Sequence, residues 1–265
     1  MTHAHANIDR KEDQVAQVGV ALVMPMAGQG SRFVRAGRTE PKPLIDIAGR
    51  PAFWWAAESV RRAVPVREMI FVVLEDHLRD FAIDTAIRDL YGEARVVTVP
   101  ALTQGAAASA ALGVAAVASA GPIAINDCDH AFVAGDALRE LAAALTHGAT
   151  GGLLGFRATS PGYSYVALDA HGLVTETAEK RVVGEFAIAG CYLFDNAQTY
   201  SAALSRYRAE CPYPELYVSG IYNVLIRAGM RVEFQELADH MPFGTPEELA
   251  RLDVTRLDRV LREEA

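Results

Sequence analysis

The residues best suited to chemistry follow the first strongly apolar run, residues 18–26. A glycine-rich segment comes next, Arg32 ends it, and Lys42 lies ten positions further on between two prolines. Glycines let backbone N–H groups approach phosphate oxygens, arginine binds those oxygens bidentately, and lysine adds a point charge. Prolines fix φ, so Lys42 is expected on a stiff extended turn. The pattern predicts a triphosphate-binding loop with Arg32 and Lys42 as catalytic cations and with backbone from Ala27, Gly28, Gln29, Gly30 and Ser31.

Two common nucleotide-binding motifs are absent from this segment. Phe33 stands where the dinucleotide-binding pattern G-x-G-x-x-G has its third glycine. The Gly-Lys-Ser/Thr of a P-loop is missing as well. The segment is therefore either a different kind of phosphate loop or a tight turn with solvated cations. The combination of two cations with the glycines favours the phosphate loop.

The elements that must position these residues alternate between strands and helices. Up to about residue 157, short apolar runs predict strands over 18–26, 69–74, 94–99, 122–126 and 152–157, and helices over 51–63, 77–91, 104–118 and 136–145. This alternation implies βαβ crossovers and a mainly parallel sheet. Beyond it we expect a β-hairpin of 163–168 and 173–178, strands over 186–194 and 231–234, helices over 196–208 and 219–228, and a last helix opened by Thr245 and Pro246.

The chain shows no internal repeat and no linker long enough to divide it. Residues 1–17 are polar and predict a flexible N-terminal tail. Residues 18–265 are expected to form a single α/β domain with a mixed, mostly parallel sheet and a β-hairpin addition. Its first part, to about residue 150, would bind a nucleotide, and its second part would bind the other substrate.

Composition limits the classes of function. With 51% apolar and 22% charged residues, the 265-residue chain is typical of a globular protein. The net charge of −8 argues against a nucleic-acid or anionic membrane surface, and no apolar run could span a bilayer. Three cysteines favour a reducing compartment, so we expect a cytoplasmic protein without nucleic-acid or membrane partners. Homo-oligomerisation stays open, because the aromatic run Phe53, Trp54 and Trp55 suits either the core or a subunit contact.

A resemblance to a known family rests on two neighbouring segments. Residues 24–33, Met-Pro-Met-Ala-Gly-Gln-Gly-Ser-Arg-Phe, and residues 41–44, Pro-Lys-Pro-Leu, resemble the signature of the sugar-1-phosphate nucleotidyltransferases, also called nucleotide-sugar pyrophosphorylases. The likeness extends from about residue 19 to residue 250. It implies a Rossmann-like three-layer α/β/α fold. It also implies an Mg²⁺-dependent enzyme of nucleotide-sugar biosynthesis that joins a nucleoside triphosphate (NTP) to a sugar 1-phosphate, or a similar phosphomonoester, and releases pyrophosphate.

The resemblance assigns roles on the nucleotide side of the reaction. Gln104 and Gly105 match the loop that contacts the nucleobase. Asp129 is the better match for a metal-binding aspartate, and Asp127 is the second. Oxygen ligands of this kind suit Mg²⁺. Arg32 would stabilise the leaving pyrophosphate and Lys42 the α-phosphate.

The resemblance also assigns the sugar-phosphate side. The residues implied there are Tyr165, Glu179, Lys180 and Gly190. Glu179 would bind sugar hydroxyls, and Lys180 would bind the attacking phosphate. No protein nucleophile is needed, because catalysis consists of positioning and charge neutralisation.

One departure from the family pattern affects the metal. Members commonly carry a second metal-binding aspartate two residues before the closing glycine, where this chain has Pro242. Asp239, His240 or Asp127 could take that role. His130, next to Asp129, could interact with the metal ligands without binding the metal itself. The missing ligand also leaves open a non-catalytic nucleotide or sugar-phosphate sensor.

A second enzyme class shares part of this pattern. Asp127-x-Asp129 after a strand also occurs in metal-dependent glycosyltransferases, which hold a nucleotide-sugar diphosphate through the metal. That reading leaves the glycine loop and Lys42 without a role. The nucleotidyltransferase therefore explains more of the sequence.

Overall fold

The central sheet starts from the first apolar run. The computed structural model describes residues 18–263, so the expected tail of residues 1–17 lies outside the described residues. Strand β1 (Val20–Met26) pairs in parallel with β4 (Val66–Leu74) on one side and with β6 (Ile123–Asn126) on the other. Strand β5 (Arg95–Val99) adds to β4 in parallel. These four strands form a continuous parallel block within the sheet.

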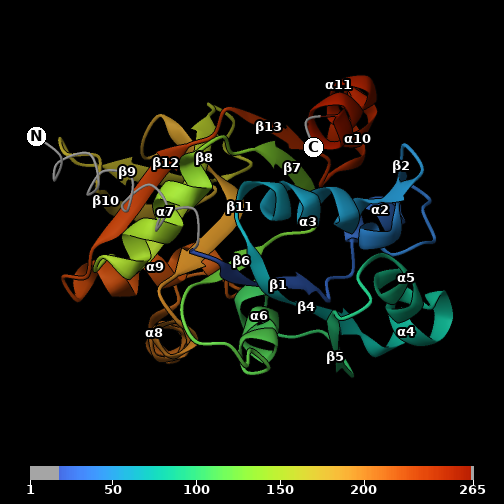
Figure 1. Ribbon diagram of the computed structural model, residues 1–265, viewed down its shortest axis with the longest axis horizontal. Coiled ribbons are helices and arrows are strands. Elements are labelled where there is room, and N and C mark those ends of the chain that lie inside the picture. The colour runs from blue at the N-terminus through green and yellow to red at the C-terminus, as the bar shows by residue number, and fades with distance from the viewer. Residues whose placement is uncertain (1–17, 264–265) are drawn as a thin grey trace, which may run out of the picture.

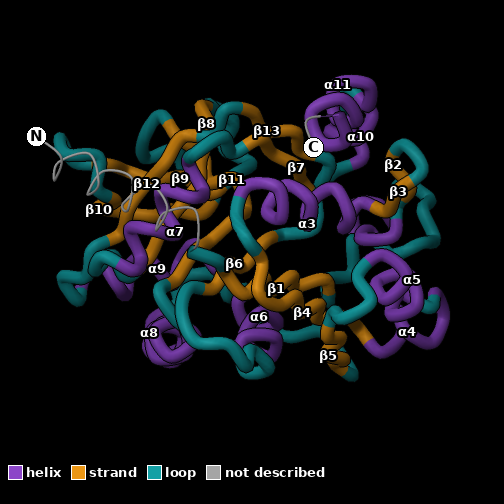
Figure 2. The backbone as a smooth tube through the Cα atoms, viewed as in Figure 1, coloured by secondary structure: helices purple, strands orange, loops and turns teal. Residues whose placement is uncertain are grey.

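The second half of the chain completes the sheet around β11 (Phe186–Phe194), which runs antiparallel to β6. The hairpin of β9 (Ser164–Leu168) and β10 (Val174–Glu179) pairs with β11, as does β8 (Gly151–Arg157). Strand β12 (Val232–Glu236) runs parallel to β8. Nine strands result, with the path β10-β9-β11-β6-β1-β4-β5 (Figures 1 and 2). The expected mixed α/β sheet and the hairpin are confirmed.

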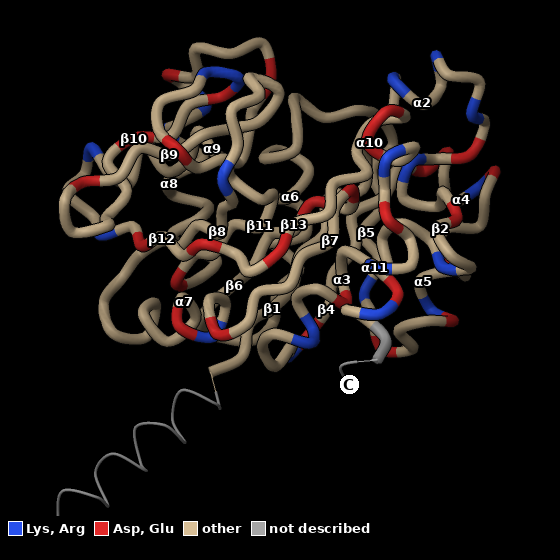
Figure 3. The backbone as a smooth tube through the Cα atoms, turned by 90° about the horizontal axis from the view of Figure 1, so that it is seen from above, with Lys and Arg blue, Asp and Glu red and all other residues tan. Residues whose placement is uncertain are grey.

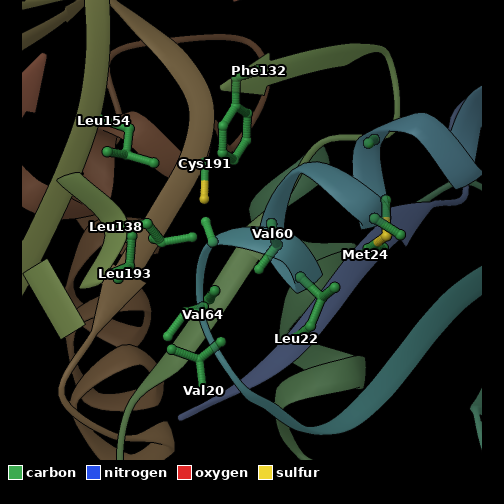
Figure 4. Packing of buried hydrophobic residues seen from close by; sticks show 14 of the residues in the cluster. Val20, Leu22, Met24, Val60, Val64, Phe132, Leu138, Leu154, Cys191 and Leu193 are labelled. Carbon is green, nitrogen blue, oxygen red and sulfur yellow. The ribbon is translucent and has the colours of Figure 1, made fainter. Parts of the chain in front are cut away.

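Helices cover both faces of this sheet because its central strands are buried on both faces. Alternate residues of β1 point to opposite sides. One set, including Val20 and Leu22, packs with α3 (Ala52–Ala63) and α7 (Ala137–Thr146). The other set packs with helices on the opposite face, namely α6 (Ala106–Val114), α8 (Ala197–Glu210) and α9 (Val218–Arg227). Figure 1 shows α3 on one side of β1 and β4 with α6 on the other, and Figure 4 shows the α3 side of the core.

Several short elements differ from the sequence-based expectations. The helix expected over 77–91 is two helices, α4 (Glu75–Phe81) and α5 (Ile83–Leu90), because Ala82 adopts a left-handed conformation with φ 49°. The helix expected over 104–118 covers only α6. A separate antiparallel pair, β7 (His130–Val133) and β13 (Asp239–Pro242), was not expected, since each strand has four residues and no apolar alternation. It brings the C-terminal segment beside Asp129.

The remaining elements frame the phosphate-loop end of the sheet. Helix α2 (Ser31–Arg35) follows the glycine loop, and a 3₁₀ turn (Lys42–Leu44) leads into the two-residue strands β2 (Asp46–Ile47) and β3 (Arg50–Pro51). Lys42 thus begins a helical turn instead of lying on an extended one. At the C-terminus, α10 (Pro246–Arg251) is capped by the Thr245 side chain as expected, and α11 (Val254–Asp258) and a last turn (Arg259–Glu263) follow.

Two questions of packing are answered by these elements. Phe53 and Trp55 are fully buried, and the Trp55 indole N–H donates to the carbonyl of Ile47 at 2.9 Å, so these two rings belong to the core. The three cysteines are free, in line with the expectation of no disulfide framework. Within residues 18–263, no helix combines the length and apolarity that a membrane crossing requires.

Candidate active site

A cavity of about 910 Å³ opens at the carboxyl ends of β1 and β6. This edge is where open α/β sheets bind ligands, since loops from several strands converge there. Its wall is formed by loops after β1 and β6, the loop before α6, the ends of the β9–β10 hairpin, the middle of β11, the connection from α8 to α9, and the segment around β13. Segments far apart in the sequence therefore share one cavity.

The glycine loop forms one side of this cavity, and all of its predicted residues line it, namely Ala27, Gly28, Gln29, Gly30 and Ser31. Gly30 has φ +59°, and a Cβ there would lie 3.3 Å from Cβ of Lys42. The carbonyl of Gly30 accepts hydrogen bonds from Phe33 at 2.8 Å and Val34 at 3.2 Å, which starts α2. The loop is thus turned sharply and lies directly against the Lys42 turn.

Lys42 and Asp129 form an ion pair on the cavity wall. Lys42 Nζ donates to Asp129 Oδ2 at 2.7 Å. Burial alone would lower the pKa of Lys42, but Asp129 and the neighbouring acidic groups raise it above its usual value. Burial would likewise raise the pKa of Asp129, and the Lys42 ammonium holds it below the usual range. Both groups are therefore charged across the physiological pH range.

Asp127 lies in the same wall and carries the excess negative charge. Burial and the charge of Asp129 raise the pKa of Asp127 to about 7. One lysine faces two carboxylates, so a further cation bound there would neutralise the remaining negative charge. Within residues 18–263, no group of three or more His, Cys, Asp or Glu side chains is arranged to hold a metal ion. Two carboxylates next to the predicted phosphate loop nevertheless fit Mg²⁺, which takes one or two carboxylates and completes its shell with substrate phosphates and water.

We expect Asp127→Asn to stabilise the substrate-free protein in a pH-dependent way. The raised pKa of about 7, against about 4 in the unfolded chain, means that the folded protein binds the extra proton between these values. Stability due to Asp127 therefore falls as the pH rises from about 4 to about 7 and stays low above that. Asn removes this loss. Urea unfolding should show a gain that is larger at about pH 8 than at about pH 5, by on the order of 1 kcal/mol or more.

The matched control for this experiment is Asp76→Asn. The Asp76 side chain is 67% exposed on α4 and does not line the cavity. The Asp76→Asn substitution removes one negative charge, as Asp127→Asn does, but from the protein surface. An equal gain in both variants would mean that net charge, and not the buried position of Asp127, causes the effect.

Of the alternative metal ligands, Asp239 is the one that lies outside the cavity. Asp239 forms an ion pair with Arg256 at 2.7 Å and does not line the cavity, whereas His240 and Pro242 do. His240 stacks on Phe156 with ring centroids 3.9 Å apart, and its buried Nδ1 has no hydrogen-bond partner among residues 18–263. Burial keeps the pKa of His240 well below its usual value. Asp127 remains the carboxylate best placed beside Asp129.

His130 lies behind the two aspartates and is 4% exposed. Burial lowers its pKa to about 4, so the ring is neutral at physiological pH. A Cβ on Gly190 would lie 2.9 Å from His130 Nε2 and 3.1 Å from Asp127 Oδ2. Because Gly190 has no side chain, His130 and Asp127 can both occupy the space beside it at the edge of the cavity.

Three cations on the cavity wall form no ion pair with a carboxylate in the described part of the chain: Arg32, Lys180 and Arg208. Arg32 is near enough to Lys180 to oppose its charge. Elsewhere in the described chain, arginines and acidic residues are interspersed along the backbone, as Figure 3 shows, and many of the arginines are paired with a carboxylate. Two neighbouring cations without acidic partners favour the binding of a ligand with several negative charges.

The predicted nucleobase loop precedes α6. Gln104 and Gly105 line the cavity, and the carbonyl of Gln104 accepts a hydrogen bond from the Leu216 N–H at 2.7 Å. Ala107 N–H donates to the Leu216 carbonyl at 2.9 Å. The loop is thus tied by backbone hydrogen bonds to the connection between α8 and α9.

Gly105→Ala should destabilise the protein and weaken NTP binding. Gly105 has φ +130°, and a Cβ would lie 2.7 Å from both the backbone N and the backbone O of Leu216. Strain of this kind costs on the order of 1–3 kcal/mol, to which the displacement of Leu216 adds. Urea unfolding and NTP-induced thermal shift measure the two effects. Gly92→Ala, where the nearest atom is 4.0 Å away, is the control and should change stability by less than about 0.5 kcal/mol.

On the acceptor side, Glu179 and Lys180 lie at the end of β10 and line the cavity. Glu179 Oε2 accepts hydrogen bonds from Ser164 and, at 3.4 Å, from Ser219. Tyr165 is placed differently from the expectation: it is fully buried, its hydroxyl donates to the Ser160 carbonyl at 2.7 Å, and it does not line the cavity.

Several cavity residues were missed by the sequence reasoning. Tyr163 lines the cavity where Tyr165 was expected, and its hydroxyl donates to Glu248 Oε1 at 3.0 Å. The connection between α8 and α9 supplies Cys211, Tyr213, Pro214, Glu215, Leu216 and Tyr217. The available signal was two prolines and two tyrosines within seven residues, between two helices, which is more structure than a plain linker needs.

Sequence comparisons find related proteins. The family model described as MobA-like NTP transferase domain matches residues 22–170. The bifunctional protein GlmU of Streptomyces avermitilis is 28% identical over 239 residues, which cover 83% of this chain and 46% of GlmU. The chain therefore spans about half the length of that curated relative.

Structural comparisons find similar folds over nearly the whole chain. A nucleoside-diphosphate-sugar pyrophosphorylase from Vibrio cholerae has a TM-score of 0.75 and 25% identity, covering 89% of this chain and 99% of that one. The inositol-1-phosphate CTP transferase of T. maritima has a TM-score of 0.71 and 16% identity, covering 92% and 98%. At that lower identity the second likeness shows the fold alone.

Proposed function

Because the chain belongs to the family of MobA-like NTP transferase domains, we propose that it transfers a nucleotidyl group from an NTP to a sugar 1-phosphate or a similar phosphomonoester. Pyrophosphate is the second product. The nucleotidyltransferase family expected from the glycine loop and Lys42 is confirmed. The acceptor, the metal and the roles of individual residues are the substance of the proposal.

The observation that carries the proposal is the meeting of three segments in one cavity. The glycine loop with Arg32, the Lys42–Asp129 pair and Lys180 all line it. These groups provide cations at three positions, which a triphosphate and a second phosphate would occupy together. A pocket for one phosphate would need only one of them.

The reaction forms one bond and breaks another. An oxygen of the acceptor's phosphate attacks the α-phosphorus, and the bond from that phosphorus to the bridging oxygen of the β-phosphate breaks. The electron pair leaves with pyrophosphate. Lys42 stabilises the negative charge on the α-phosphate oxygens, Arg32 stabilises the departing pyrophosphate, and Lys180 holds the attacking phosphate in line.

Asp129 and Asp127 would hold the divalent cation, which we propose is Mg²⁺. When bound, this cation neutralises charge on the phosphate oxygens. Lys42 donates a hydrogen bond to Asp129 at 2.7 Å, so the carboxylate is held in place at the cavity wall. This positioning keeps Asp129 available to the nucleotide side of the cavity.

Two observations favour a polyhydroxylated acceptor. Glu179 is fixed in the cavity by Ser164 and Ser219, and a fixed carboxylate accepts hydrogen bonds from neighbouring hydroxyl groups. The pyrophosphorylase from Vibrio cholerae acts on nucleoside-diphosphate sugars by its name and matches nearly full length. We further propose that residues 18–265 act as one domain, in which the part before about residue 150 binds the NTP and the part after it binds the acceptor.

A screen of pyrophosphate release tests this function. Each of ATP, GTP, CTP, UTP and dTTP is combined with a panel of sugar 1-phosphates and other phosphomonoesters, with Mg²⁺ and with a chelator. We expect release for a small number of pairs and only with the metal. A silent screen with NTP binding still detectable by thermal shift would favour the sensor, and sugar transfer from a preformed nucleotide sugar would favour the glycosyltransferase.

A further inference from the structure

The backbone of Lys180 has an unusual conformation for a residue with a long side chain. Its φ is +53°, in the left-handed region that glycine favours. Its N–H donates to the carbonyl of Tyr163 at 3.1 Å, which holds the turn at the end of β10. The strain indicates that the direction of this side chain is fixed by its surroundings.

The ammonium group of Lys180 is held by Tyr217 and not by a carboxylate. Nζ donates to the Tyr217 hydroxyl at 3.2 Å and lies 5.2 Å from the centre of the Tyr217 ring. Tyr217 is a neutral partner, so Lys180 keeps its positive charge on the cavity wall without an ion pair to a carboxylate among the described residues. A carboxylate partner, such as Asp129 provides for Lys42, would cancel much of that charge.

Tyr217 is itself firmly placed. The residue before it, Leu216, is hydrogen bonded through both its N–H and its carbonyl to the loop before α6. The Tyr217 carbonyl accepts from the Gly220 N–H at 3.2 Å, and the ring of Tyr213 lies edge-on to it at 5.7 Å. The hydroxyl of Tyr213 in turn accepts from the Glu179 N–H at 3.2 Å. The connection between α8 and α9 thus supports the end of β10 at two neighbouring residues.

We propose that Tyr217 is a positioning residue that sets the place of the Lys180 ammonium for the phosphate group of the acceptor. The inference rests on the proposed function, since that function gives Lys180 its phosphate ligand. Tyr217 acts through Lys180 and does not need to touch the acceptor. Its hydroxyl orients the ammonium without neutralising it, so Lys180 is pre-organised for an anion.

The first test needs no substrate. The chain has three lysines, Lys11, Lys42 and Lys180, so amine labelling can be read at each one by mass spectrometry. Without the Tyr217 hydroxyl, the Lys180 amine loses a hydrogen bond that favours its charged form. At mildly alkaline pH, Tyr217→Phe should label Lys180 about two- to ten-fold faster relative to Lys42. An unchanged ratio of Lys180 to Lys42 labelling would overturn the proposal.

The second test is a double-mutant cycle with the NTP and acceptor pair found in the pyrophosphate screen. Tyr217→Phe should raise the KM of the acceptor about three- to ten-fold and leave the KM of the NTP unchanged. In a Lys180→Met background the same change should cost less than about two-fold, because the group it positions is gone. Tyr91→Phe, a buried hydroxyl bonded to Glu58 away from the cavity, should leave both KM values unchanged.

The two tests separate this inference from the proposed function. If Tyr217→Phe speeds the labelling of Lys180 but no pair in the screen releases pyrophosphate, the contact between Tyr217 and Lys180 is supported and the proposed reaction is contradicted. An active screen with equal losses in both backgrounds of the cycle would keep the reaction and overturn the role of Tyr217.

Discussion

Lys42→Met is expected to lower kcat by about 10²–10³-fold, with a smaller effect on the KM of the acceptor. The substitution keeps most of the apolar stem and removes the only charge that the described structure pairs with Asp129. In the proposed mechanism that charge stabilises the α-phosphate oxygens as the new bond forms. Steady-state pyrophosphate release over a range of NTP and acceptor concentrations gives both constants.

Arg35→Met is the matched control for Lys42→Met. Arg35 is a cation of the same region, at the end of α2, but it is exposed and does not line the cavity. Its guanidinium donates to the carbonyl of Ser31 at 3.2 Å. Its loss should change kcat by less than about two-fold. A Lys42→Met enzyme that keeps more than about a tenth of wild-type kcat would contradict the role of Lys42.

Asp129→Asn is expected to abolish most metal-dependent turnover, by about 10² or more. Asn keeps the size of the side chain and its hydrogen-bonding oxygen, but it is a poor ligand for Mg²⁺ compared with a carboxylate. A second readout is the rise in melting temperature on adding NTP with Mg²⁺. That rise should shrink in the variant to the value seen with NTP and chelator.

Asp239→Asn tests whether Asp239, which the sequence offers as a second metal ligand, contributes to the metal site. Asp239 lies on β13, directly before the cavity-lining His240, but it forms an ion pair with Arg256. Its replacement should cost some stability and leave the effect of Mg²⁺ on melting unchanged. Loss of the metal effect in Asp239→Asn with retention in Asp129→Asn would reverse the assignment.

Much of the fold follows from local pattern. Residues 18–26 and 69–74 form short apolar runs, which are typical of strands buried on both faces, and β1 and β4 are the centre of the parallel sheet. The place of the glycine loop could be predicted for the same reason, since it follows β1 and must lie at the carboxyl end of that strand. The carboxyl ends of parallel strands meet at one edge, so the loop and Asp129 had to come together.

Features that depend on contacts between residues far apart in the sequence could not be predicted from local pattern. Ala82 breaks the helix expected over 77–91 although alanine is the best helix former, so tertiary packing overrides its propensity. Tyr163 and Tyr165 are two residues apart and have similar side chains, and only the surrounding structure shows that Tyr163 lines the cavity and Tyr165 is buried. The partnership of Lys180 with Tyr217 joins residues 37 apart in the sequence. No local pattern predicts such a contact.

The most direct test of the central claim follows the phosphates of a labelled NTP. With the active NTP and acceptor pair, label in the α-phosphate should appear in the product in which a phosphoanhydride bond joins the nucleotide to the acceptor's phosphate. Label in the γ-phosphate should appear only in pyrophosphate, and both transfers should fail in Lys42→Met. Release of γ-label as inorganic phosphate, or its transfer to the acceptor, would mean attack at a different phosphorus and would contradict nucleotidyl transfer.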